Sequence, residues 1–160
     1  MNLHIFQTPQ YREIINKTIF ETIEYLFSKN QDFAIACEVK YIKFKPPLPS
    51  SIVKSFEDTV LFILSGYTFE SASIDEESFS FEAGFGADNI GSTVSLPLLG
   101  IKQIFVGEHP IVINLSSPPT IENIQELHIP KKNSKLSMEA LLNNPKNKKL
   151  KKLLKNKGTE

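Results

Sequence analysis

The segment from residue 78 to residue 97 constrains the fold of this chain more than any other. In "SFSFEAGF" aromatic and small apolar side chains alternate with polar ones, so one face of the segment is apolar. This period of two is typical of a half-buried β-strand. The run "GADNIG" supplies residues that tolerate turn dihedrals, and "STVSLP" resumes an extended pattern that ends at Pro97. The segment therefore predicts a β-hairpin whose aromatic side chains face a core.

One amphipathic helix is predicted near the N-terminus. Thr8 can cap its first turn, Pro9 is tolerated there, and apolar residues then recur at three- and four-residue spacing as far as Asn30. The apolar stripe allows two interpretations, which the pattern weighs equally: one face packed within the chain, or a face that also contacts a second copy. In the second interpretation the dimer interface comprises Ile15, Ile19 and Ile23.

Several extended segments follow this helix. They cover residues 33–44, 59–66, 79–85, 93–96 and 110–116, with a short helical turn expected within 98–105. Their connections are too short for the crossovers that parallel strands need. We therefore predict a mainly β fold with an N-terminal α-helix, in which a mostly antiparallel sheet curls into a small barrel. A chain of 160 residues can bury such a core in one domain without disulfides or a metal.

The zero net charge of the chain conceals a division between two regions. Residues 1–130 hold 8 Lys and Arg against 16 Asp and Glu, a balance of −8, and residues 131–160 hold 10 Lys against 2 Glu, a balance of +8. A folded surface that gripped phosphates would be expected to carry a positive patch. The acidic region is short of the charges needed to make one.

The C-terminal part of the sequence differs in composition from the rest. From residue 117 it is poor in aromatic residues and rich in Lys, Asn, Ser and Pro, so it cannot bury enough apolar surface to fold alone. We predict a helix-plus-barrel domain over residues 1–116 and a disordered tail over residues 117–160. Two short apolar segments in the tail, at 136–142 and 150–155, have the character of linear motifs that dock on a partner.

No pattern of side chains predicts catalysis. His4, His109 and His128 lie in unrelated segments, without a carboxylate or second histidine at the spacing of a metal site or a catalytic triad. The glycine-rich run at 84–91 joins two strands and does not lead into a helix, as a phosphate-binding loop would. We expect a protein that is not an enzyme and that uses no cofactor and no metal.

The location of the protein is also predicted from the sequence. Cys37 is the single cysteine and has apolar neighbours, which favours a buried thiol and a reducing cytosol. The N-terminus lacks the pattern of a secretion signal, and no apolar run approaches the roughly 20 residues of a membrane span. We expect a soluble cytoplasmic protein with no membrane partner.

The order of the elements, together with three motifs, resembles the SspB family, the stringent starvation protein B adaptors of the ClpXP protease. The motifs are "VLFILS" at 60–65, "FEAGFG" at 81–86 and "VSLPLLGIKQIF" at 94–105. The resemblance covers roughly residues 9–116. It implies a small Sm-like barrel that dimerises through its first helix and binds the degradation tag of stalled nascent chains in a groove. It also implies a flexible tail that docks on the unfoldase ClpX.

The resemblance assigns roles to particular residues. The peptide-binding positions are Gly84, Phe85, Gly86 and Ala87, where the family usually has a second glycine in place of Ala87. The docking positions in the tail are Leu150, Lys151, Lys152, Leu153 and Leu154. The partners implied are tagged polypeptides, ClpX and a second copy of the chain.

An Sm-like RNA-binding module is the alternative function. In that interpretation the lysine-rich tail supplies the affinity and the barrel some selectivity. The tail lacks the aromatic or arginine side chains that would stack on bases, and the rest of the chain is acidic. We therefore expect that nucleic acid is not a partner.

Overall fold

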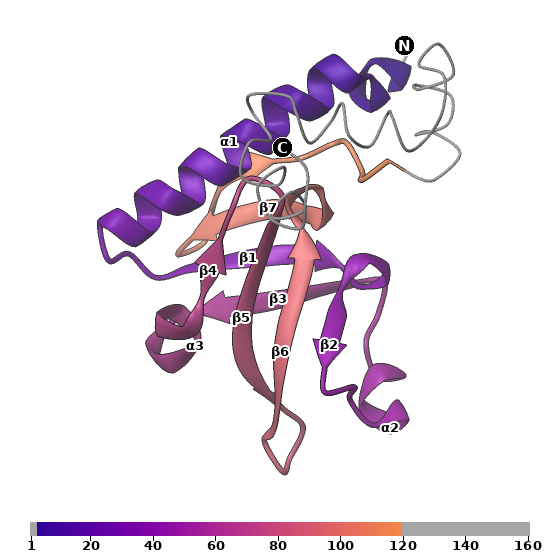
Figure 1. Ribbon diagram of the computed structural model, residues 1–160, viewed down its shortest axis with the longest axis vertical. Helices are drawn as coiled ribbons and strands as arrows, with labels where there is room; N and C mark the ends of the chain where they lie inside the picture. Colours follow the sequence, from indigo (N-terminus) through magenta and orange to yellow (C-terminus); the bar gives the residue numbers. More distant parts are fainter. Residues whose placement is uncertain (1–2, 120–160) are drawn as a thin grey trace, which may run out of the picture. The chain divides into compact units, whose positions relative to one another are not determined.

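A computed structural model of the chain describes residues 3–119 (Figure 1). A short 3-10 helix, η1 (Leu3–Gln7), precedes the 20-residue helix α1 (Pro9–Ser28). The Thr8 side chain caps α1 by accepting a hydrogen bond from the Tyr11 amide. The predicted helix and its N-cap are confirmed, and α1 ends just before the predicted Asn30.

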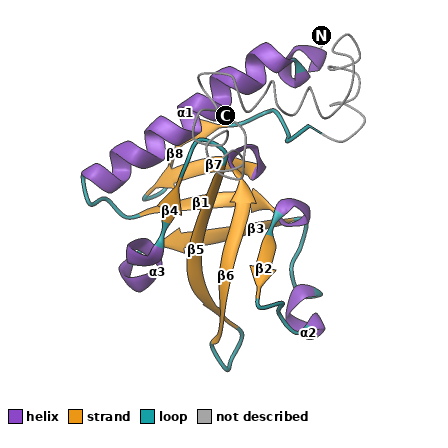
Figure 2. Ribbon diagram, viewed as in Figure 1, coloured by secondary structure: helices purple, strands orange, loops and turns teal. Residues whose placement is uncertain are grey.

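The rest of the described chain is mainly β-strand, arranged in two antiparallel four-stranded sheets (Figure 2). The strands are β1 (Phe33–Glu38), β2 (Lys43–Lys45), β3 (Thr59–Leu64), β4 (Ser73–Ile74), β5 (Ser78–Phe85), β6 (Ile90–Pro97), β7 (Ile101–Val106) and β8 (His109–Ile113). Sheet A has the order β3-β1-β7-β8 and sheet B the order β2-β6-β5-β4. Within residues 3–119 no strand of sheet A pairs with a strand of sheet B, so the two sheets remain separate. The prediction of a mainly β fold with an N-terminal helix is confirmed.

Short helical elements link the sheets. They are η2 (Val39–Tyr41) between β1 and β2, α2 (Ser50–Val53) before β3, α3 (Gly66–Ser71) between β3 and β4, and η3 (Leu98–Gly100) between β6 and β7. The chain therefore crosses from sheet A to sheet B at η2, returns to sheet A at α2, crosses again at α3 and returns at η3.

The predicted hairpin is confirmed as β5 and β6. Phe81 pairs with Val94 and Phe79 with Leu96 across the two strands, and all four side chains are at most 2% exposed. The alternation of apolar and polar residues therefore predicts correctly which face of sheet B packs on the core.

Two predicted segments differ from the structure. Residues 33–44 form two strands in different sheets, because η2 turns the chain between them. Residues 98–105 begin with the expected turn but continue as β7. A bulge opposite Ala36 and Cys37 adds one residue to β7, so Ile101 and Ile104 both face the core at a helix-like spacing of three.

The dimer-interface residues predicted on α1 belong to the core of the single chain. Ile15, Ile19 and Ile23 are 7%, 0% and 0% exposed, and they lie in the same apolar cluster as Phe79 and Phe81. Their assignment to a dimer interface is therefore wrong, since the chain's own sheets already cover them. The helix uses this stripe as a single packed face.

Cys37 is also part of this core, where burial raises the pKa of its thiol. Among residues 3–119, no helix is both long and apolar enough to cross a membrane.

Candidate peptide-binding site

A hollow of about 370 Å³ lies on the outer face of sheet B. It is lined by Lys45, Pro46, Tyr67, Glu82, Ala83, Gly84, Asn89, Gly91, Ser92 and Thr93. Glu82 and Thr93 pair across β5 and β6 next to the buried pair Phe81 and Val94, so alternation directs them away from the core. The hollow therefore uses the side of the hairpin opposite its aromatic residues.

The floor of the hollow contains two glycines that face each other. Gly84 on β5 pairs with Gly91 on β6, so no side chain rises from either strand at this point. Nothing lies within 4 Å of a Cβ added at Gly91. At Gly84 an added Cβ would lie 1.8 Å from Asn89 Oδ1, because the Asn89 side chain covers that glycine. Gly91 therefore leaves its backbone open to the close approach of another main chain, whereas Asn89 covers Gly84.

Polar groups of opposite charge flank the floor. The Tyr67 hydroxyl, on α3, donates a hydrogen bond to Glu82 Oε1 at 2.5 Å. This bond and the negative charge of Glu82 raise the pKa of Tyr67 above its ordinary value. Lys45 pairs with Thr93, which pairs with Glu82, so the cation and the carboxylate lie two strands apart across the hollow.

The β2 side of the hollow is fixed by a contact between strands. Ser92 is 4% exposed, and its Oγ donates a hydrogen bond to the Pro46 carbonyl at 2.9 Å. The bond ties the end of β2 to β6 and so holds Lys45 beside Thr93.

The structure brings one of the four predicted peptide-binding residues to this hollow. Gly84 lines it, whereas the Phe85 ring points to the opposite side of sheet B, where it contacts Phe44, Phe56 and Phe62. Gly86, with a φ of 75°, faces Ile52, and a Cβ there would lie 3.1 Å from Ile52 Cδ1. Ala87 is exposed in the turn and is not part of the lining.

Sequence reasoning missed the polar residues of the hollow. The position of Glu82 could have been predicted, because this residue alternates with Phe81 and so belongs to the outer face of the predicted strand. Lys45 and Tyr67 lie on a three-residue strand and a six-residue helix. Elements this short contain too few residues for a period of apolar and polar side chains to be recognised in the sequence.

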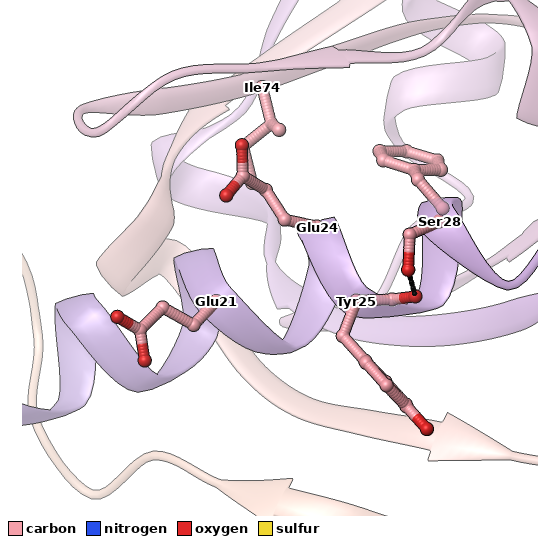
Figure 3. Close-up of a pocket in the computed structure, with 6 residues that line it drawn as sticks. Glu21, Glu24, Tyr25, Ser28 and Ile74 are labelled. Atoms are coloured by element: carbon pink, nitrogen blue, oxygen red, sulfur yellow. Dashed lines mark hydrogen bonds between the residues drawn. The ribbon is translucent and has the colours of Figure 1, made fainter.

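A second hollow, of about 650 Å³, lies beside the C-terminal half of α1 (Figure 3). It is lined by Glu21, Glu24, Tyr25, Phe27, Ser28 and Ile74. Glu24 points toward Ile74 while the Tyr25 ring points away, and Ser28 Oγ donates to the Tyr25 carbonyl at 2.7 Å. Two carboxylates, Glu21 and Glu24, give this hollow an acidic wall.

The predicted docking residues of the tail, Leu150, Lys151, Lys152, Leu153 and Leu154, lie outside the described residues. Within residues 3–119, no group of three or more His, Cys, Asp and Glu side chains is placed to hold a metal ion. No protein-family model matches the chain, and a search of curated proteins finds no matching sequence.

Proposed function

We propose that the chain is a non-enzymatic adaptor that binds an unstructured degradation-tag peptide in the hollow on sheet B. The tagged polypeptide is then delivered to the ClpXP protease in the cytoplasm. The observation that carries the proposal is the open backbone at Gly91 on the floor of the hollow. A peptide main chain can approach closely where no side chain rises from the floor, and the groups around the floor can then contact its side chains.

The rim of the hollow supplies groups that suit a peptide. Lys45 can bind a carboxylate of the peptide, and the Thr93 hydroxyl can donate to or accept from its backbone. Tyr67 adds an aromatic wall whose hydroxyl is held by Glu82. A few polar groups placed around an open floor fix orientation while leaving the sequence of the peptide loosely specified.

The proposal includes an Sm-like barrel as the finer description of the fold. The corners at η2 and η3 each carry the chain directly from one sheet into the other. One apolar cluster also includes buried residues of both sheets, such as Ile35 of β1 and Phe81 of β5. Both features are expected of a small barrel opened along its sides.

The delivery step rests on the resemblance to the SspB family. In the proposal, Leu150 to Leu154 dock on ClpX while the hollow holds the cargo. Linking two binding modules makes the second contact effectively intramolecular, which raises avidity by about 10² to 10⁴ without a strong individual motif.

Gly91→Gln is expected to weaken binding of a nascent-chain tag peptide at least about tenfold. The added side chain would rise into the hollow, and because open space surrounds the Cβ position the fold itself should be unaffected. Isothermal titration calorimetry measures the affinity, and a thermal melt shows whether the variant is folded.

Ala87→Gln is the matched control, because it adds the same side chain to the same hairpin outside the hollow. It should bind the peptide as tightly as the parent. If both variants weakened peptide binding equally, the binding site would lie at the turn. If the parent protein did not bind the peptide, the proposed function would be refuted.

A further inference from the structure

The outer face of sheet A is apolar across all four strands. The side chains that point away from the core at its centre are Ala34 and Ala36 of β1, Leu61 and Ile63 of β3, Gln103 and Phe105 of β7, and Ile111 and Ile113 of β8. We call these residues the sheet A outer face. Gln103 is the one polar member of the set.

Strand register makes this face continuous. Ala34 pairs with Ile63 on one side and Phe105 on the other, and Gln103 pairs with Ile113. The large aliphatic side chains stand well exposed: Leu61 by 55%, Ile63 by 64%, Ile111 by 45% and Ile113 by 53%. In Figure 2 the strands of sheet B cross those of sheet A, whose opposite side packs on the core.

The face differs in charge from the rest of the described surface. Apart from His109, the described strands of sheet A carry two charged residues, Glu38 and Lys102, which pair with each other at 3.3 Å. Glu38 lies at one end of the outer face, where it pairs with Thr59, and its charge is balanced by Lys102. Residues 3–119 hold 8 Lys and Arg against 14 Asp and Glu, a balance of −6. Two such bodies repel each other over most orientations, and a face without net charge is where they approach at least cost.

The area of the face is suited to a dimer. Four aliphatic side chains with these exposures present roughly 400 Å² of apolar surface, which is large for a single patch on a monomer. A standard interface buries about 800 Å² on each partner, of which a little over half is apolar. The sheet A outer face therefore supplies the apolar part of one side of a standard interface.

We propose that the sheet A outer face binds a second copy of this chain, sheet against sheet. Two-fold symmetry sets the same patch on both partners, and sheets that pack face to face interdigitate their side chains at about 10 Å separation. This interface replaces the one predicted on α1, whose three residues are buried in the chain itself. It lies on a different sheet from the peptide-binding hollow, so it does not depend on the proposed function.

Ile63→Lys is expected to weaken self-association of the full chain about a hundredfold, because symmetry places the new charge in the interface twice and each is expected to cost about tenfold. Sedimentation velocity over a range of micromolar concentrations measures the monomer–dimer equilibrium. Ile63 is exposed in the single chain, so the variant should fold, and circular dichroism checks this.

Ile14→Lys on α1 is the matched control, since Ile14 is 62% exposed and carries the same substitution on another surface. The proposal expects this variant to dimerise as the parent does, and expects Ile63→Lys to bind tag peptide with unchanged affinity. A parent that is monomeric throughout overturns the proposal, and so does dissociation by Ile14→Lys that equals or exceeds that by Ile63→Lys.

Discussion

Phe79→Ala is expected to lower the free energy of unfolding by about 3–5 kcal/mol. Phe79 is fully buried where three elements meet. Its ring centroid lies 6.2 Å from that of Phe27 on α1, 6.4 Å from that of Phe33 in sheet A and 5.4 Å from that of Phe81 in sheet B. Truncation removes these contacts at once and leaves a cavity that neighbours held by three different elements cannot readily fill. Urea unfolding followed by far-ultraviolet circular dichroism measures the change.

Phe56→Ala provides the comparison. Phe56 is only partly buried, and its ring contacts Phe44 and Phe85 at the margin of the core. The same truncation should therefore cost less than half as much, since water can enter the space that it leaves. Equal losses for the two variants would show that the junction at Phe79 is not the main packing point of the fold.

The elements with a sustained period were predictable from the sequence. The helix α1 repeats its apolar residues over five turns, and the hairpin of β5 and β6 alternates strictly, so each pattern has one physical interpretation. The helix pattern does not show which surface its apolar stripe packs against. A face packed on its own sheets and a face packed on a second copy require the same residues at the same spacing, and only the buried positions of Ile15, Ile19 and Ile23 distinguish them.

The interruptions of the pattern were not predictable. The bulge in β7 puts Ile101 and Ile104 on one face at a spacing of three, which a sequence displays as a helical turn. The turn η2 divides an apolar run into strands of two sheets because of contacts made elsewhere, among them the hydrogen bond from the Val39 amide to the Asp58 carbonyl. Such turns are decided by tertiary contacts and not by local propensity.

Only the part of the candidate site that lies on the hairpin could be predicted from the sequence. Gly84 follows from the hairpin, and its partner Gly91 follows once the register is known. Lys45 and Tyr67 reach the hollow only because β2 and α3 flank the hairpin in space, and their own segments give no sign of it. Recognition surfaces assembled from short elements therefore require the three-dimensional structure even where the hairpin that carries their floor is plain from the sequence.

The second large effect is expected at Asn114, just after β8, which is 3% exposed. Its Nδ2 donates hydrogen bonds to the carbonyls of Leu99 at 3.0 Å and Ile101 at 2.9 Å, and its Oδ1 accepts one from the Ser116 amide at 2.7 Å. These bonds tie the chain after β8 to the corner formed by η3. Asn114→Asp keeps the shape of the side chain but turns an oxygen and a buried negative charge toward two carbonyl oxygens. We expect a loss of about 3–5 kcal/mol in the free energy of unfolding at neutral pH, as for other uncompensated buried charges.

Asn89→Asp is the control for this prediction, because the same chemical change falls on an exposed turn residue whose φ of 52° asparagine and aspartate both tolerate. Its effect on unfolding should stay within about 0.5 kcal/mol. Asn114→Ala, which removes the three bonds without adding charge, should fall between the two variants, since it leaves buried carbonyls unpaired but imposes no repulsion on them. If Asn114→Asp proved no less stable than Asn114→Ala in urea unfolding, the two carbonyls would not be held against the side chain, and the link between β8 and the η3 corner would have to come from apolar packing alone.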